Sequence, residues 1–338
     1  MSSLDETIEY VRSWCTHILD ARRDVTILPL AGGANNAVFL CHSGSDRYVV
    51  KVLPPSSDGR ADRFRAESEF LQYANTAATD FVPTIINIDS DARILAMEYL
   101  EGRRFDSENP PRSSDIECAA GFLCALNSTS QIDKPSYDLR AADGFLKLSA
   151  HLSDVRQRAA DMELEHLPRK FRVEGGAFIT ALATEIMKAE RALEFALCSS
   201  EIDDDWPSEK MILSPSDFGF HNAMATRRGV VFYDFEFAGW DDPAKTVCDF
   251  VLQPKVTPGQ DANEQILCAL AGIVNTDRVR ARCSVLEHVL RIKWITIALA
   301  VLRPQRWQAL IDVAFDKSPE MIIRERFATA HTLMNSGA

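Results

Sequence analysis

Three polar residues in the second half of the chain have the types and spacing that phosphoryl transfer uses. Asp217 is followed five positions later by Asn222, and Asp234 ends the apolar run 230–233. In this chemistry one carboxylate accepts the proton of the attacking hydroxyl, while an amide oxygen and a second carboxylate hold Mg²⁺ on the phosphates of ATP. A lone Asp before an aromatic residue is usually a turn or cap residue, so the prediction depends on the whole set.

A second group of candidate residues lies in the first hundred positions. A turn between two apolar runs can bring backbone N–H groups against phosphates, and it contains Gly32, Gly33, Asn35 and Asn36. The same glycines are also compatible with a simple hairpin turn. Lys51 lies inside the apolar run 48–53. A lysine among apolar residues of a strand favours a phosphate-binding role over that of an exposed charge on an edge strand that only improves solubility. A helical segment follows with Glu67 and Glu69, of which Glu67 is the preferred partner of Lys51.

The hydrophobic patterns predict the elements that position these residues. Short β-branched or aromatic runs, the first three of them an antiparallel meander, predict strands at 25–30, 37–41, 47–53, 84–88 and 93–100. Three- and four-residue spacing predicts helices at 4–20, 61–75, 115–127, 175–196, 262–274, 277–302 and 319–334. The polar stretch 107–114 separates the β-rich part from the helical part, where only the region 211–237 returns to short extended pieces.

These motifs resemble those of the aminoglycoside phosphotransferase and choline kinase family, whose fold is that of the protein kinases. The resemblance runs from Leu30 to about Pro254. The segment 213–222 resembles the family's catalytic loop, which implies that Asp217 is the base and Asn222 a magnesium ligand. The tripeptide Asp-Phe-Glu that begins at Asp234 resembles the metal-binding motif, which implies that Asp234 is the second magnesium ligand.

The resemblance implies a bilobal, protein-kinase-like fold of the α+β class. An N-lobe of five antiparallel strands, residues 1–101, would bind the phosphates and adenine of the nucleotide. A mainly helical C-lobe, residues 102–338, would carry the catalytic loop, the metal site and the substrate cleft. The segment 97–102 resembles the hinge between the lobes, so we expect backbone groups of Glu98 and Leu100 to meet the adenine edge.

The implied activity is transfer of the γ-phosphate of ATP, with Mg²⁺, to a hydroxyl of a small molecule such as an aminoglycoside, an amino alcohol or a sugar-like metabolite. One departure from the family keeps a second hypothesis open, because Pro215-Ser216 replaces the usual His-Gly before the catalytic Asp. That hypothesis is a nucleotide-binding pseudokinase with a regulatory or scaffold role. Protein kinase activity is disfavoured, since Asp-Phe-Glu replaces D-F-G and no A-P-E follows at the expected distance.

Three further side chains keep two interpretations each. His221 could shuttle a proton, or it could simply pack or hydrogen-bond in the loop. Glu236 could be a third metal contact or the partner of a cation. Lys293, like Arg291 nearby, could face an anionic group of the substrate or extend to the surface.

Composition excludes other classes of function. The net charge of −12 has the wrong sign for broad binding to nucleic acid, so we expect none as a partner. Charged residues interrupt the most apolar stretch, 286–302, which argues against a membrane protein. Acidic residues near the start, where a secretory signal needs basic ones, favour the cytoplasm. The eight scattered cysteines show no zinc or disulfide spacing and are expected to be buried thiols. The sequence leaves the oligomeric state open.

Overall fold

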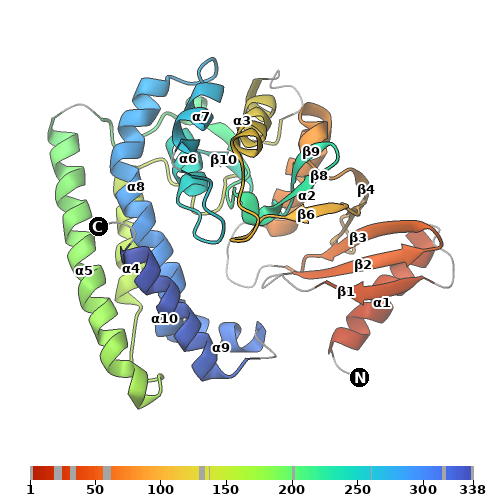
Figure 1. Cartoon of the computed structure of the whole chain (residues 1–338), viewed down its shortest axis with the longest axis horizontal. Coiled ribbons are helices and arrows are strands. Elements are labelled where there is room, and N and C mark those ends of the chain that lie inside the picture. Colours follow the sequence, from red (N-terminus) through yellow and green to blue (C-terminus); the bar gives the residue numbers. More distant parts are fainter. Residues whose placement is uncertain are drawn as a thin grey trace. The chain divides into compact units, whose positions relative to one another are not determined.

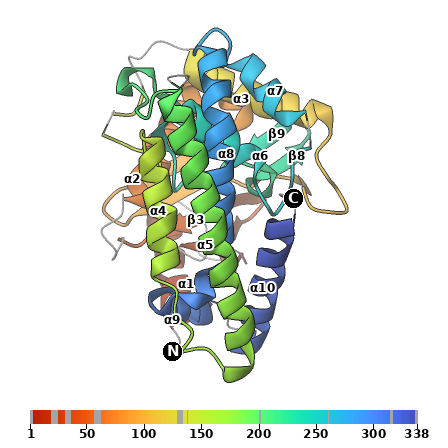
Figure 2. The same ribbon diagram turned by 90° about the vertical axis from the view of Figure 1, so that its left-hand side faces the viewer.

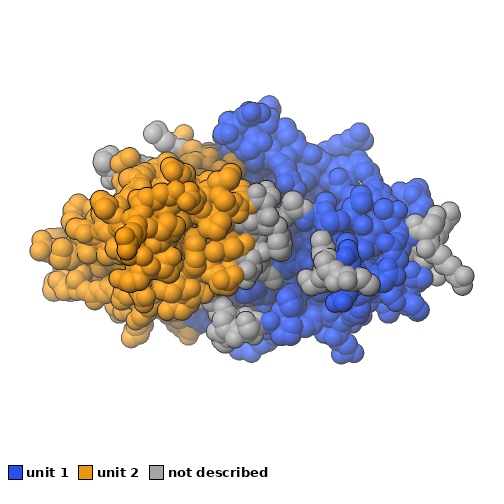
Figure 3. All heavy atoms as spheres, turned by 90° about the horizontal axis from the view of Figure 1, so that it is seen from below, with its two compact units in different colours: residues 1–142, 213–240 blue, residues 143–212, 241–338 orange. Residues whose placement is uncertain are grey.

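The chain forms two compact units, which Figure 3 colours separately. A computed structural model describes residues 3–18, 25–30, 36–55, 62–128, 134–136, 138–199, 202–259, 261–313 and 317–335. Unit 1 comprises residues 1–142 and 213–240, and unit 2 comprises residues 143–212 and 241–338. The expected lobe boundary between residues 101 and 102 falls inside unit 1 and remains a prediction.

A five-stranded antiparallel sheet begins unit 1, as predicted (Figure 1). Its strands in chain order are β1 (Thr26–Pro29), β2 (Ala37–Ser43), β3 (Asp46–Val52), β4 (Ile85–Asp89) and β5 (Ile94–Glu98). The spatial order β1-β2-β3-β5-β4 places β3 in the centre. Gly44 has a φ of 63°, a left-handed conformation that suits the tight turn from β2 to β3.

Helix α1 (Ser3–Ile18) packs on one face of this sheet (Figure 1). Its buried Val11, Trp14 and Cys15 join alternate residues of the strands, among them Phe39 and Val50, in one hydrophobic cluster. Because successive side chains of a strand point to opposite faces, Lys51 is directed to the other face. Helix α2 (Arg63–Ala77) follows, with Asp62 as its N-cap accepting from two backbone N–H groups.

The rest of unit 1 holds the catalytic motifs on short elements. A second antiparallel sheet has the order β6-β8-β9, and a third pairs β7 with β10. The elements are η1 (Thr79–Phe81), β6 (Gly102–Arg104), α3 (Ser113–Ser128), β7 (Ile212–Ser214), η4 (Phe220–Asn222), β8 (Ala223–Thr226), β9 (Gly229–Phe232) and β10 (Gly239–Asp241). The expected extended pieces between 211 and 237 are β7, β8 and β9, whereas β6 and β10 were not predicted.

Unit 2 is helical, and α4, α5 and α8 run side by side in it (Figure 2). Its elements are α4 (Leu148–Ala160), α5 (Arg169–Cys198), η3 (Ser208–Lys210), α6 (Pro243–Val251), α7 (Ala262–Ala269), α8 (Thr276–Ala298), η5 (Leu299–Leu302), α9 (Pro304–Val313) and α10 (Pro319–Asn335). The sequence did not predict α4 or α9, and it began α5 too late. Gly175 lies inside α5, and Leu164 and Leu302 pack where the Cβ of a larger residue would lie.

The cysteines correct one expectation. Four of them, Cys15, Cys41, Cys248 and Cys283, are buried thiols as predicted, but Cys198 and Cys268 are exposed. Cys198 and Cys268 lie near the ends of α5 and α7, where a residue need not face the core. No helix in the described part of the chain is long and apolar enough to cross a membrane.

Candidate active site

Lys51 lies between two carboxylates in unit 1. Its Nζ is 2.6 Å from Glu67 Oε2 and 2.5 Å from Asp234 Oδ1. Lys51 and Glu67 are buried, while the Asp234 side chain is 37% exposed. Glu69, the less favoured partner, pairs instead with Arg65 on its own helix. The structure thus brings together three of the predicted site residues from β3, α2 and the segment after β9.

Burial and neighbouring charge determine how this cluster is protonated. Burial alone would lower the pKa of Lys51, but Asp234 and Glu67 together raise it above its ordinary value. Burial raises the pKa of Glu67 to about 7, although Lys51 opposes the shift. Lys51 therefore stays a cation at neutral pH, as a phosphate-binding lysine requires.

The carboxylate of Asp217 is held by the end of its own loop. Its Oδ2 lies 3.2 Å from His221 Nε2 and 3.3 Å from Asn222 Nδ2. Asn222 Nδ2 also donates to the Asp217 carbonyl oxygen over 3.1 Å. The amide nitrogen of Asn222 is thus used within the loop, which orients its oxygen as the atom that could bind a cation. His221 thus hydrogen-bonds to the predicted base, and both interpretations of this residue allow that contact.

Serine residues brace the catalytic loop where the family's histidine is missing. Ser216 N–H donates to the buried Ser214 Oγ over 3.1 Å, and Ser216 Oγ donates to the Ala142 carbonyl over 3.4 Å. Ser216 has a φ of 64°, a conformation that usually favours glycine and that costs free energy for serine. Such strain persists only where surrounding contacts impose it, and it occurs here one residue before Asp217.

The hairpin of β8 and β9 brings the two predicted magnesium ligands to the same end. Ala223 is opposite Phe232 in the register, so Asn222 and Asp234 flank the paired strands. Tyr233 N–H extends the pairing by donating to the Asn222 carbonyl over 2.9 Å. Asp234 follows with a φ of 68°, a second strained residue at a predicted ligand. The hairpin register therefore brings both predicted ligands to one end of the paired strands.

An aromatic cluster, which sequence reasoning missed, packs against the segments that carry these groups. Phe70 of α2 packs on Phe235, the neighbour of Asp234, with ring centroids 4.6 Å apart. Phe122 of α3 stacks on Phe232 at 5.2 Å, and Phe218, the neighbour of Asp217, lies 5.1 Å from Phe232. These rings are buried. The only sequence signal was that phenylalanines flank both acidic motifs.

The remaining predicted nucleotide contacts are placed in part. Gly32, Gly33 and Asn35 lie outside the described residues. Asn36 is described, and its Nδ2 donates to Glu236 Oε2 over 2.8 Å.

The hinge residue Glu98 is anchored through both its backbone and its side chain. Its N–H donates to the Thr84 carbonyl over 3.0 Å. Its side chain accepts from Thr84 N–H and pairs with Arg228. Leu100, two residues further, is half-buried.

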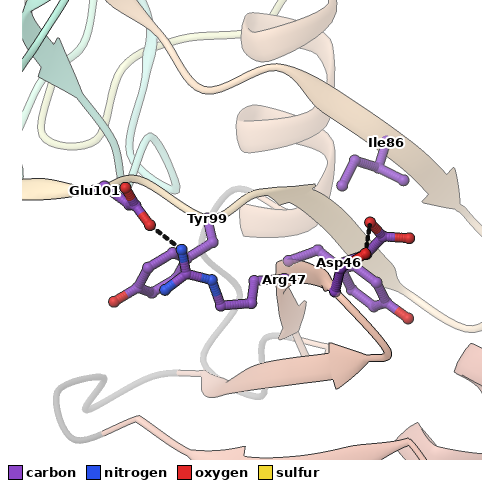
Figure 4. Close-up of a pocket in the computed structure, with 7 residues that line it drawn as sticks. Asp46, Arg47, Ile86, Tyr99 and Glu101 are labelled. Carbon is purple, nitrogen blue, oxygen red and sulfur yellow. Dashed lines mark hydrogen bonds and ion pairs between the residues drawn. The ribbon is translucent and has the colours of Figure 1, made fainter.

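A hollow at the other side of the hinge region contains none of the predicted residues. It has a volume of about 490 Å³ and is lined by Ser45, Asp46, Arg47, Tyr48, Ile86, Tyr99 and Glu101 (Figure 4). Within it Arg47 lies over the Tyr99 ring, 4.8 Å from its centroid, and pairs with Glu101. These contacts join the start of β3 to the predicted hinge segment 97–102.

The two cations considered for the substrate are both paired within unit 2. Lys293 Nζ is 3.3 Å from Asp143 Oδ2, and Arg291 donates to Glu287 on the same helix over 2.9 Å. Lys293 is buried rather than extended to the surface.

Comparison with known proteins identifies the family. The sequence profile of the phosphotransferase enzyme family matches residues 26–252. A search of curated protein sequences finds no match. Among solved structures, spectinomycin phosphotransferase in complex with ADP and spectinomycin is similar, with 15% identity, a TM-score of 0.63 and coverage of 96% of this chain and 98% of that one.

Two kinases of amino alcohols have similar structures. An ethanolamine kinase from Plasmodium vivax has 11% identity and a TM-score of 0.60, covering 100% of this chain and 92% of that one. A choline kinase from Streptococcus pneumoniae has 14% identity and a TM-score of 0.55, covering 98% and 99%. At these identities the likeness shows the fold, which is the predicted kinase-like one. Because the family profile spans most of the sequence, the chain belongs to the phosphotransferase enzyme family.

Proposed function

We propose that this protein transfers the γ-phosphoryl group of ATP, with Mg²⁺, to a hydroxyl of a small molecule. The observation that carries the proposal is the buried Lys51, held between Glu67 and Asp234. Membership of the phosphotransferase family supports a small-molecule phosphotransferase. The similar structures were solved with ADP, spectinomycin or hygromycin B, or are kinases of amino alcohols, which supports acceptors of the aminoglycoside, amino alcohol or sugar-like classes.

The residues present fit Mg·ATP. The described residues contain no cluster of three His, Cys, Asp or Glu side chains that would hold a metal ion alone. Mg²⁺ in kinases is instead bound by one or two protein oxygens together with the phosphates of the nucleotide. Asn222 and Asp234 can provide these protein oxygens. Lys51 is a cation whose Nζ lies beside Asp234, and it can bind phosphate oxygens.

Each side chain then has a separate task. When bound, Mg·ATP supplies the transferable group and offsets the negative charge that develops on it. Glu67 holds Lys51, and Lys51 binds phosphate oxygens. Asp217, oriented by His221 and Asn222, would accept the proton of the acceptor hydroxyl as the hydroxyl oxygen bonds to the γ-phosphorus and the bond from that phosphorus to ADP, the leaving group, breaks. Positioning and charge neutralisation supply most of the rate, and the base supplies about 10²–10⁴-fold.

The pseudokinase hypothesis loses its main support in this arrangement. It was motivated by the missing histidine before Asp217. Ser214 and Ser216 make hydrogen bonds that brace the loop in its place. The proposed base, the two proposed magnesium ligands and the Lys51–Glu67 pair are all present.

The experiment is ATP consumption by the purified protein with Mg²⁺, measured across pools of aminoglycosides, amino alcohols and monosaccharides. We expect one pool to stimulate turnover in the wild type. Asp217→Asn should abolish that signal while Mg·ATP binding, measured by calorimetry, is retained. Asp277→Asn, the same change at an exposed helix position, is the matched control.

Three results would contradict parts of the proposal. Retained turnover in Asp217→Asn would remove the role given to this residue. Failure of the wild type to bind Mg·ATP would remove the nucleotide from the proposal. Mg·ATP binding without turnover in any pool, followed by silence in a lysate metabolite screen, would favour the pseudokinase.

A further inference from the structure

One hydrogen bond joins residues that lie 200 positions apart: Asn36 Nδ2 donates to Glu236 Oε2 over 2.8 Å. Asn36 ends the predicted phosphate-binding turn and directly precedes β2. Glu236 is the last residue of the Asp-Phe-Glu motif and is only 5% exposed. The bond therefore connects the nucleotide end of the sheet to the metal-binding motif.

The chemistry of the two groups fixes the direction of this bond. The Asn36 amide nitrogen is the donor of this bond and the Glu236 carboxyl oxygen is the acceptor, so the amide nitrogen faces Glu236. The other amide atom, Asn36 Oδ1, is buried and has no hydrogen-bond partner among the described residues. A buried acceptor without a partner is unfavourable.

A second link runs parallel to the first. Val38 of β2 is opposite Lys51 of β3 in the register, and Lys51 pairs with Asp234. The start of β2 and the adjacent strand β3 therefore each send one side chain to the Asp-Phe-Glu motif. Lys51 and Asp234 are both assigned to the nucleotide and its metal ion, whereas the bond from Asn36 to Glu236 uses neither of them. It can persist while the other pair engages ligands.

From this geometry we propose that Glu236 is a positioning residue and not a magnesium ligand: it holds Asn36, and so fixes the end of the phosphate-binding turn against the metal-binding motif. The inference rests on the proposed function. Glu236 Oε2 is already occupied by an amide, and Glu236 is far less exposed than the Asp234 side chain, which is 37% exposed. Mg²⁺ usually keeps several waters, which suits the more exposed carboxylate.

The test exchanges the donor and the acceptor. The variants are Asn36→Asp, Glu236→Gln and the double variant Asn36→Asp/Glu236→Gln. The probe is the ATP analogue AMP-PNP, titrated by calorimetry with and without Mg²⁺. Glu117→Gln and Asn335→Asp make the same charge changes at exposed positions and serve as controls. Urea unfolding without nucleotide checks that every variant folds.

Asn36→Asp should weaken Mg·AMP-PNP binding by about tenfold, because two carboxylates then face each other. The double variant should bind within about threefold of the wild type, since the amide introduced at position 236 can donate to the carboxylate introduced at position 36 and the bond is restored in reverse. The Mg²⁺ concentration for half-maximal binding should stay the same in the double variant.

A metal-ligand role predicts the opposite pattern. Glu236→Gln alone would then raise the Mg²⁺ requirement, and the double variant would not recover; either result overturns the inference. Unchanged affinity in Asn36→Asp would also overturn it. These outcomes leave the proposed function intact as long as the wild type binds Mg·AMP-PNP. If the wild type does not bind, the proposed function and this inference fail together.

Discussion

At the residue scale, the catalytic loop shows how one chemical group can replace another. A buried histidine braces this loop in the family that the motifs resemble. Here Ser214 accepts the backbone N–H of Ser216, and Ser216 in turn donates to Ala142. The left-handed φ of Ser216 is the cost of this arrangement. What matters for Asp217 is a fixed backbone next to it, and hydroxyl groups can provide that.

Ser214→Ala tests whether the Ser214 hydroxyl braces this loop in place of a histidine. The change leaves the buried N–H of Ser216 without its acceptor, so unfolding should require about 1–3 kcal/mol less free energy. Turnover should fall while Mg·ATP affinity changes little, because Lys51 and Asp234 are not touched. Urea unfolding and the ATP-consumption assay measure the two effects. Ser153→Ala, at an exposed helix position, is the control; equal losses in both variants would contradict the prediction.

At the element scale, side chains with no chemical role hold the acidic motifs in place. The aromatic cluster joins α2, α3 and β9 to the residues that follow Asp217 and Asp234. In unit 2, the buried Arg282 of α8 plays a comparable part. Its guanidinium donates to Asp242, the N-cap of α6, and to the carbonyls of Leu146 and Asp203. The aromatic cluster and Arg282 thus each contact several elements at one place.

Phe235→Ala should destabilise the protein by about 3–5 kcal/mol, the usual cost of removing a buried aromatic ring. Phe235→Leu should cost less, because it leaves a smaller cavity. The distinguishing expectation is that Phe235→Leu also lowers Mg·ATP affinity, since Asp234 is its direct neighbour. Calorimetry and urea unfolding report these effects. An affinity equal to that of the wild type in Phe235→Leu would show that the ring supports the fold alone.

Arg282→Leu should also be strongly destabilising. Asp242 is fully buried, and without Arg282 it becomes an uncompensated charge, which costs about 3–5 kcal/mol. The double variant Arg282→Leu/Asp242→Asn removes that charge but keeps a capping side chain for α6, so it should recover part of the loss. Arg280→Leu, at a more exposed position of the same helix, is the control. Chemical denaturation compares these variants with the wild type, and no recovery in the double variant would contradict the prediction.

At the scale of the whole molecule, a buried histidine contributes to the way stability responds to acid. His151 is buried, and its Nε2 lies 3.0 Å from the Phe145 carbonyl. Burial lowers the pKa of His151 well below its usual 6.5, and the nearby cations Lys245 and Lys293 lower it further. The folded protein therefore keeps His151 neutral at a pH where the unfolded chain takes up a proton.

The contribution of His151 to stability should thus decrease as the pH falls below the unfolded value, while the raised pKa values of Glu67 and Asp241 act in the opposite direction. Below about pH 6.5 the unfolded state binds one more proton at this site, so each pH unit should remove up to about 1.4 kcal/mol. His151→Gln can still donate to the Phe145 carbonyl and removes this contribution, so on going from about pH 6.5 to 5 the variant should lose less stability, or gain more, than the wild type. Urea midpoints across this range measure it, with His331→Gln, at an exposed histidine, as the matched control. An unchanged slope in His151→Gln would refute the assignment.

Much of the candidate site could be predicted because its parts are local in sequence. Asp217, Asn222 and Asp234 flank one hairpin, and short β runs and turn spacing make that hairpin recognisable. The choice of Glu67 over Glu69 agrees with helical spacing, since Glu67 lies three residues after the buried Phe64. The five strands of the first sheet were predicted for the same reason, because each strand is a short run of β-branched or aromatic residues that can be recognised locally.

Tertiary structure alone decided the contacts between distant segments. The amino-acid pattern near Glu236 contains no sign of Asn36, and β6 is a strand of three exposed residues that exists because β8 offers it a free edge. Ser216 donates to a carbonyl far away in the sequence, and Arg282 joins three separate segments. Both sets of partners depend on how segments that are distant in the sequence pack together. Local propensity and periodicity are properties of neighbouring residues and are visible in the sequence. The choice of a distant partner depends on the shape and polarity of surfaces that only folding brings together.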